Sequence, residues 1–166
     1  MPRRERNGRR VRHGHPARIA TMAPPSRQKD ARPHRVRMRM RSRREAVGPT
    51  VDRILSAVAP AGLSDSQRDD LAVAVAEALS NAAVHGNRLR ARSLVSIIVD
   101  VVPRVEAVVE VKDGGTGFNA ADLEDPTDAS HILVPGGRGV FLMRRLTDEM
   151  EYGAPGNRVR LTKRAR

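Results

Sequence analysis

The 166-residue chain contains no cysteine. Disulfides, thiolate metal sites and cysteine nucleophiles are therefore excluded. No stretch approaches the roughly 20 apolar residues that a membrane-spanning helix requires. The basic N-terminal stretch is not followed by the apolar run of a secretory signal. Together these absences predict a cytoplasmic protein that makes no membrane contact.

Aromatic residues are also few, and Phe118, Phe141 and Tyr152 are the whole set. Single-stranded nucleic acids are bound largely by stacking of bases on aromatic side chains. Sequence-specific binding of single strands is therefore disfavoured.

Charge is plentiful but unevenly distributed along the chain. Residues 1–44 hold 16 Lys and Arg against two acids, whereas residues 45–166 hold 15 against 17. The net charge of +12 therefore belongs to the N-terminal part. Non-specific contacts between this basic arm and nucleic-acid phosphates stay open as an alternative role for it.

The composition divides the chain into two parts. Residues 1–33 are rich in Arg, Pro, Gly and His, and they carry few large apolar side chains. Such a segment buries too little apolar surface to offset its loss of conformational entropy, so we predict a disordered basic arm. Residues 34–166 are long enough to form one domain with a real core.

Hydrophobic periodicity predicts strands and helices throughout residues 34–166. A period-2 strand begins near His34, and Ser64 with Gln67 forms a capping box that opens the second helix. We expect strands at about 34–41, 93–102, 105–112, 148–153 and 157–163, helices at about 47–58, 64–86 and 139–147, and a loop at 119–135. Strands before, between and after the helices predict an α+β fold, a two-layer α/β sandwich whose mixed, mostly antiparallel sheet carries its helices on one face.

The second predicted helix carries the first functional motif. Glu77, Asn81 and His85 recur one helical turn apart, at the margin of the apolar stripe. A carboxylate and a carboxamide so spaced can hold a hydroxyl proton and a Mg²⁺ ion, respectively. The alternative is a solvated helix face that ends near Gly86, because short patterns recur by chance.

Two glycine-rich stretches complete the candidate site. Asp113 ends a predicted strand and is followed by Gly-Gly-Thr-Gly, where a carboxylate could accept a hydrogen bond from the amine of adenine. The stretch 136–139 (Gly-Gly-Arg-Gly) precedes a predicted helix, whose first N–H groups suit a phosphate. Each could also be an ordinary turn or loop.

Taken together, the three stretches resemble the N box (E-x-x-x-N…H-G), the first glycine box (D-x-G-x-G) and the second glycine box (G-x-G before a helix) of the GHKL ATPases. That superfamily has the Bergerat ATP-binding fold, and the resemblance covers about residues 34–164. The size, the N-terminal strand and helix, and the closing sequence GGRGVFLMRRLTDEM look like the anti-sigma-factor serine/threonine kinases within it.

The resemblance implies ATP and Mg²⁺ as cofactors and a role for each matching residue. Glu77 would be the catalytic base, and Asn81 would coordinate Mg²⁺. Asp113 would bind the adenine amine with Gly115 and Gly117 beside the base, and Gly137 and Gly139 would present N–H groups to the phosphates. The expected nucleotide-binding set is Asn81, His85, Asp113, Gly115, Gly117, Gly137, Arg138 and Gly139.

By the same resemblance, such a protein holds a sigma factor inactive and phosphorylates a serine or threonine of a small anti-anti-sigma protein of the STAS type. A homodimer is expected in this family. Two alternatives keep the fold: an ATP-binding module that sequesters a partner without phosphate transfer, and a histidine-kinase-like ATPase core. No Lys or Arg occurs between Asp113 and Gly137, so Mg²⁺, backbone amides and Arg138 would have to neutralise the phosphates.

Overall fold

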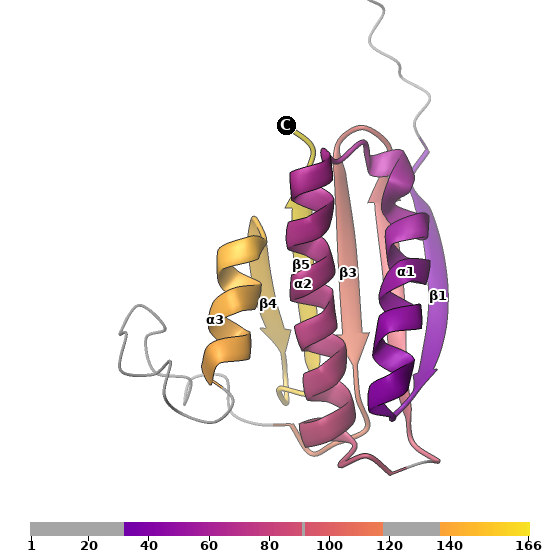
Figure 1. Ribbon diagram of the computed structural model, residues 1–166, viewed down its shortest axis with the longest axis vertical. Coiled ribbons are helices and arrows are strands. Elements are labelled where there is room, and N and C mark those ends of the chain that lie inside the picture. The colour runs from indigo at the N-terminus through magenta and orange to yellow at the C-terminus, as the bar shows by residue number, and fades with distance from the viewer. Residues whose placement is uncertain (1–31, 91, 118–136) are drawn as a thin grey trace, which may run out of the picture.

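The computed structural model describes residues 32–90, 92–117 and 137–166 (Figure 1). The arm predicted at 1–33 lies outside these residues except for its last two positions, and the loop predicted at 119–135 lies wholly outside them. The strands are β1 (His34–Arg41), β2 (Leu94–Val102), β3 (Glu106–Lys112), β4 (Glu149–Gly153) and β5 (Arg158–Arg164). The α-helices are α1 (Val47–Val58), α2 (Asp65–Asn81) and α3 (Gly137–Leu146), with short 3₁₀ turns at Arg44–Ala46 and Ala59–Ala61 and a π-helical turn at Ala82–Gly86.

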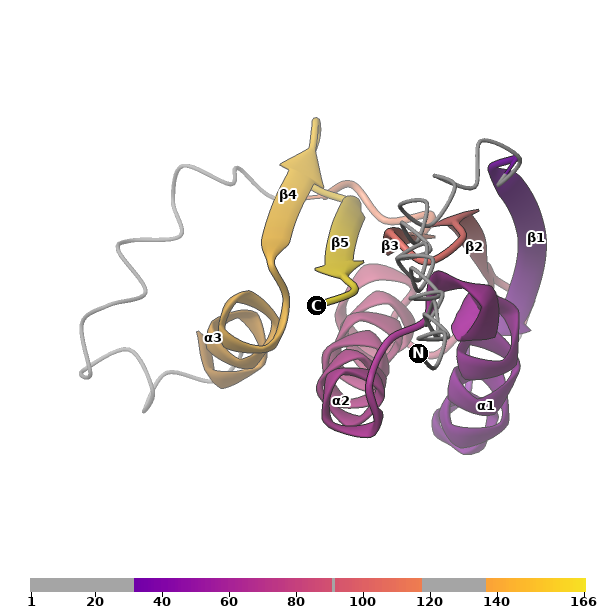
Figure 2. The same cartoon turned by 90° about the horizontal axis from the view of Figure 1, so that it is seen from above.

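All five described strands form one sheet in the order β1-β2-β3-β5-β4. Every pairing between them is antiparallel. The three α-helices lie together on one face of this sheet, with α2 between α1 and α3 (Figures 1 and 2). The predicted two-layer sandwich is confirmed, and the sheet of the described strands contains no parallel pair.

The sheet is held to the helices by the inward-facing side chains of each strand. On β1, Met38 and Met40 are buried while the arginines between them are exposed. On the central strands, Val99 pairs with Val109, which in turn pairs with Leu161, and all three are fully buried. Alternation in the sequence thus becomes one apolar layer beneath the helices.

Helix α2 lies over the centre of the sheet. Ser64 caps its N-terminus, where the Gln67 N–H donates to the Ser64 hydroxyl and the Ser64 N–H donates to the Gln67 side chain. This confirms the predicted capping box. The predicted apolar stripe is also buried: Leu71, Val75, Ala78, Leu79 and Ala82.

Three local features differ from the sequence prediction. The α-helical hydrogen bonding of α2 ends at Asn81, and the chain continues to Gly86 as a π-helical turn. Val105, predicted to face inward at the start of a strand, lies in the preceding turn and is 50% exposed. Helix α3 includes Gly137, two residues before its predicted start, and its fully buried residue is Met143.

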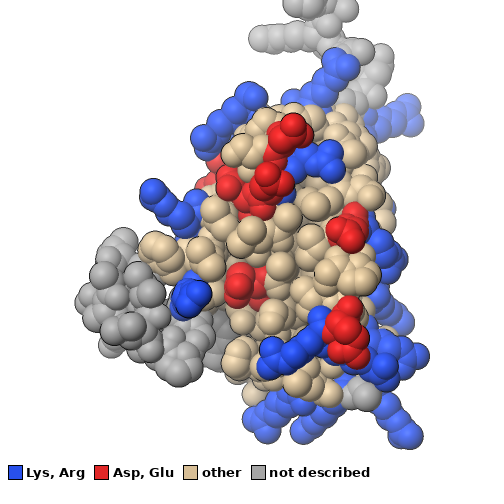
Figure 3. All heavy atoms as spheres, in the orientation of Figure 1, with Lys and Arg blue, Asp and Glu red and all other residues tan. Residues whose placement is uncertain are grey.

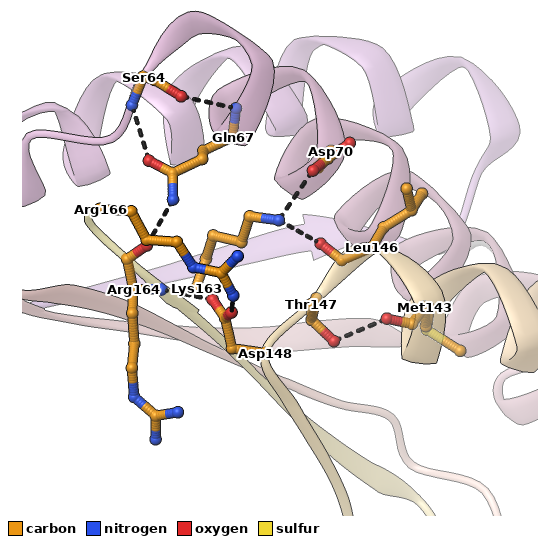
Figure 4. A network of polar contacts seen from close by, with 10 residues as sticks. All are labelled: Ser64, Gln67, Asp70, Met143, Leu146, Thr147, Asp148, Lys163, Arg164 and Arg166. Carbon is orange, nitrogen blue, oxygen red and sulfur yellow. Dashed lines mark hydrogen bonds and ion pairs between the residues drawn. The ribbon is translucent and has the colours of Figure 1, made fainter.

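Lys163 of β5 joins both flanking helices at the end of the sheet shown in Figure 4. Its side chain is 10% exposed, and its Nζ donates to Asp70 Oδ2 of α2 and to the Leu146 carbonyl of α3, both at 2.8 Å. The last carbonyls of a helix carry partial negative charge, which a lysine ammonium group complements. This buried cation therefore fixes the C-terminus of α3 against α2 and the sheet.

Further hydrogen bonds join the end of β5 to α2 and to the start of β4 at this end of the sheet. The Gln67 side chain donates to the Arg164 carbonyl at 2.7 Å, and the Arg164 N–H donates to Asp148 Oδ2 at 2.8 Å. Thr147 donates to the Met143 carbonyl in the last turn of α3.

Among the described residues, no helix is both long and apolar enough to cross a lipid bilayer.

Replacing Lys163 with Met should lower the free energy of unfolding by about 1–3 kcal/mol, because Asp70 and the Leu146 carbonyl would lose a largely buried donor. Chemical denaturation of the full chain measures this loss. The matched control is Arg35→Met, which breaks the exposed ion pair with Asp100 and should destabilise the protein clearly less than Lys163→Met. Equal losses in the two variants would show that the Lys163 contacts contribute no more than a surface pair.

Candidate functional site

Glu77 and Asn81 lie one turn apart in the last turns of α2, and both are half-buried. Helix α3 packs directly against this part of α2. A Cβ built on the buried Gly139 would lie only 2.8 Å from Glu77 Oε2 and 3.2 Å from Asn81 Nδ2. A side chain at position 139 would therefore displace the Glu77 carboxylate and crowd the Asn81 amide, and glycine lets α3 approach both groups as they lie.

The first turn of α3 provides the backbone donors of the site. Gly137, Arg138 and Gly139 all belong to this turn. The N–H groups of a first helical turn have no partner within the helix and carry partial positive charge. Arg138 adds an exposed guanidinium group at the same place. The turn can thus receive an anionic group beside Glu77 and Asn81.

His85 is placed differently from the other two residues of its motif. It lies within the π-helical turn and is exposed, and none of the hydrogen bonds among the described residues involves its side chain. The structure brings Glu77 and Asn81 to Gly139, whereas the His85 side chain is exposed.

A second cluster forms where the π-helical turn meets the end of β3. Gly86 lies so close to Asp113 that a Cβ at position 86 would overlap the carboxyl group. The Gly115 N–H donates to Asp113 Oδ1 at 2.7 Å. A Cβ on Gly115 would lie 2.7 Å from the Gly86 carbonyl oxygen. The two glycines therefore enclose the carboxylate between two backbone segments.

Burial raises the pKa of Asp113 above the ordinary value of an aspartate, and the hydrogen bond from the Gly115 N–H opposes this shift in part. A carboxylate in such surroundings lacks full hydration, so its charged form gains from an added donor. Oδ1 accepts the Gly115 N–H at 2.7 Å, and the Asp113 backbone N–H also favours the charged form. Asp113 is thus suited to accept one bond from a ligand amine.

Two asparagines hold the Asp113 loop in place. Asn87 is buried, and its Oδ1 accepts the Gly114 N–H at 2.9 Å while its Nδ2 donates to Ser42 Oγ at 2.7 Å and to the Leu94 carbonyl at 3.2 Å. From the other side, Asn157 Nδ2 donates to the carbonyls of Asp113 and Gly115 at 3.3 and 3.2 Å. The loop is therefore supported by both neighbouring segments.

Gly117 completes this packing. Its φ is +75°, and a Cβ there would overlap the Pro155 carbonyl of the β4–β5 turn. Any other residue would be strained and would collide with that turn. Gly117 thus has a structural reason for being glycine in addition to the proposed contact with the base.

The protein groups near Gly139 fit a magnesium ion that is held mainly by its nucleotide. No cluster of three or more His, Asp or Glu side chains able to hold a metal occurs among residues 32–90, 92–117 and 137–166. Asn81 offers one amide oxygen, with the Glu77 carboxylate one turn away. Mg²⁺ in nucleotide sites commonly takes one or two protein ligands and completes its shell with phosphate oxygens and water.

Sequence reasoning gave no role in the site to Asn87, Asn157 or Ser42, and it included Gly86 only as the last residue of the N box. Gly86 and Asn87 directly follow His85, so the first motif already contained their signal. Asn157 is distant along the chain and follows a Gly in a hairpin turn, which has an ordinary local explanation. Only the pairing of β3 with β5 places it beside Asp113.

Comparison with known proteins is consistent with this geometry. A family model described as a histidine kinase-like ATPase domain matches residues 40–163, most of the chain. The matched span contains both clusters of the site. No curated protein sequence matches the chain.

Replacing Asn87 with Ala should lower the free energy of unfolding by about 1–3 kcal/mol, because the Gly114 N–H and the Ser42 hydroxyl lose a buried partner. Nucleotide affinity should fall as well, since the Asp113 loop would no longer be held. Denaturation and calorimetric titration measure the two effects. The control His85→Ala removes an exposed side chain of the same turn and should change stability by less than about 0.5 kcal/mol. An Asn87→Ala protein with unchanged stability would contradict the supporting role of Asn87.

Asp113 should titrate above the ordinary aspartate range in the free protein, and its pKa should fall when ATP binds. In the expected contact, the adenine amine would donate to the carboxylate and so favour its charged form. ATP affinity should therefore be highest above this pKa and decrease as the pH falls through it. Carboxyl-carbon NMR with and without nucleotide measures the shift. GTP presents a carbonyl where ATP has the amine, so it should bind weakly; an equal pKa shift with GTP would contradict the adenine contact.

Proposed function

The chain belongs to the histidine kinase-like ATPase domain family, an ATP-binding family, and on this basis we propose that it is an ATP-dependent serine/threonine protein kinase of the anti-sigma type. In this proposal it binds a sigma factor and phosphorylates a STAS-type anti-anti-sigma protein. The finer assignment draws on the resemblance of its three motifs and of its C-terminal sequence to such kinases.

The observation that carries the proposal is the approach of Gly139 to Glu77 and Asn81. This contact joins a candidate base and a candidate metal ligand, both on α2, to the N-terminus of α3. The two helices are far apart in the sequence. Phosphoryl transfer depends mainly on positioning and on electrostatic stabilisation, and these three groups supply both. The Asp113 cluster, beyond the π-helical turn, suits the base of the same nucleotide.

Each residue has a defined task in the proposed reaction. Glu77 orients the substrate hydroxyl and accepts its proton, while the hydroxyl oxygen bonds to the γ-phosphorus and the bond to the β–γ bridging oxygen breaks, releasing ADP. Asn81 would hold Mg²⁺, which neutralises phosphate charge when it is bound with ATP. The N–H groups of Gly137 and Gly139, with Arg138, bind phosphate oxygens.

The partners belong to the proposal as well. Sequestration of the sigma factor would depend on nucleotide state, and phosphorylation of the STAS-type protein would decide which of the two is bound. A homodimer and a cytoplasmic location accompany this role in the resembling kinases. A serine- or threonine-containing protein encoded beside this chain is the natural substrate to test.

A second candidate function is an ATP-binding module that sequesters its partner without transferring phosphate. It is favoured by one feature of the sequence, the lack of any Lys or Arg between Asp113 and Gly137, where four further acids lie. A kinase of this kind must neutralise the γ-phosphate without a cation from that segment. Phosphate transfer to the partner separates the two candidates.

Replacing Glu77 with Gln should reduce phosphate transfer from labelled ATP to the STAS-type partner by roughly 10²–10⁴-fold, the usual contribution of a general base. ATP affinity should stay near the wild-type value, because Gln keeps the size and polarity of the side chain. Asn81→Ala is the companion variant, and it should weaken ATP binding in the presence of Mg²⁺ but not in the presence of a chelator.

Transfer at the wild-type rate by Glu77→Gln would disprove its role as base. If the wild-type protein binds Mg²⁺–ATP but transfers no phosphate, the sequestering module is the correct alternative. A wild-type protein that does not bind ATP would contradict both candidate functions.

A further inference from the structure

A row of arginines lies on the exposed face of the edge strand β1. Arg35, Arg37, Arg39 and Arg41 alternate with the buried side chains of β1, so all four point away from the helices. Successive members of this arginine row are about 7 Å apart along the strand. Lys and Arg side chains gather along the edge of the molecule where β1 lies (Figure 3).

Most of this charge has no protein partner. Arg35 forms a two-bonded ion pair with Asp100, with Nε to Oδ1 at 2.6 Å and Nη2 to Oδ2 at 2.9 Å. Within the described residues, Arg37, Arg39 and Arg41 form no ion pair. Asp100 also attracts Arg37 at longer range, but the three adjacent cations repel one another, so the strand gains if an anion binds along them.

A cleft continues the row around the end of β1. It has a volume of about 320 Å³ and is lined by arginines from three segments: Arg39 and Arg41 of β1, Arg43 of the connection and Arg53 of α1. Glu45 is the one acid in its lining. Charged residues on an edge strand can also serve only to prevent strand pairing between molecules. Prevention of strand pairing would explain the arginines of β1. It would not explain Arg53, which lies on α1 in the helix layer and not on a strand edge.

We propose that the arginine row and this cleft bind the phosphate backbone of nucleic acid without sequence preference. Guanidinium groups bind phosphates through two parallel hydrogen bonds, and a regularly spaced row suits a polymer with one charge per unit. The chain that leads into β1 adds to the same charge, since residues 1–44 hold 16 Lys and Arg against two acids. The surface offers no aromatic side chain for base stacking, so contact is limited to the backbone.

The proposal is independent of the nucleotide site and adds a second binding activity to it. A protein partner with an acidic surface is the other occupant that charge alone would permit. The length of the basic region favours nucleic acid, because a folded acidic surface rarely presents an extended line of anions. The experiment below distinguishes the two.

The test measures binding of the full chain to a short fluorescent duplex DNA of arbitrary sequence by anisotropy, at several salt concentrations between about 50 and 200 mM. The variant is Arg37→Gln/Arg39→Gln/Arg41→Gln. The slope of log K against log salt is negative, and its magnitude counts contacted phosphates at about 0.9 per contact on duplex DNA, so the magnitude should decrease by about 2–3 in this variant. Contacts made by residues 1–33 would remain in both proteins and would not obscure the difference.

The matched control is Arg68→Gln/Arg144→Gln/Arg145→Gln, which removes the same charge from the helix layer, at the half-buried Arg68 of α2 and the exposed Arg144 and Arg145 of α3. Its slope should equal that of the wild type. Equal slopes in all three proteins, or equal decreases in both variants, would overturn the proposal. So would stronger binding to poly-glutamate than to the duplex, which would identify an acidic protein as the occupant. Melting temperature and ATP affinity should be unchanged in the β1 variant, showing that the fold and the nucleotide site are intact.

Discussion

The close packing of α3 against α2 at Gly139 is the constraint on which the candidate site depends. The absence of a side chain there lets the first turn of α3 reach Glu77 and Asn81. At the other end of the same helix, Lys163 binds the Leu146 carbonyl and Asp70. The two ends of α3 are thus fixed by different means, by close contact at the site and by a buried cation away from it. A helix held in this way presents its N–H groups to a ligand without having to move.

The Asp113 loop is supported by a separate set of contacts. Asn87 and Asn157 bind its backbone from opposite sides, and Gly86 leaves room for the carboxyl group. Because the carboxylate is partly buried, it has lost hydrogen bonds to water. A ligand amine can replace one of these hydrogen bonds. The elements that hold the Asp113 loop are therefore distinct from those that hold the first turn of α3 at Glu77 and Asn81, and the π-helical turn after Asn81 separates them.

The charge of the molecule is divided in space as well as along the chain. The exposed row on β1 is basic, whereas the residues after position 44 are nearly neutral overall. Ser42 follows the basic strand, between Arg41 and Arg43, and accepts a hydrogen bond from the side chain of Asn87 in the nearly neutral part. One buried asparagine thus contacts both the connection that follows the arginine row and the loop that holds Asp113.

The sequence alone determined the fold class and named most of the candidate site, because both depend on local patterns. Alternation on β1, the capping box at Ser64 and the stripe of α2 each depend on near neighbours, and each occurs as predicted. Glu77, Asn81, Asp113 and Gly139 were found by motif.

The tertiary structure alone decided which of these residues come together. It placed Gly139 on Glu77 and Asn81, and it left the His85 side chain exposed on the π-helical turn that follows them. It also recruited Ser42 and Asn157, whose partners are far away in the chain. Contacts of that kind arise from strand order and helix packing, and no short sequence pattern encodes them.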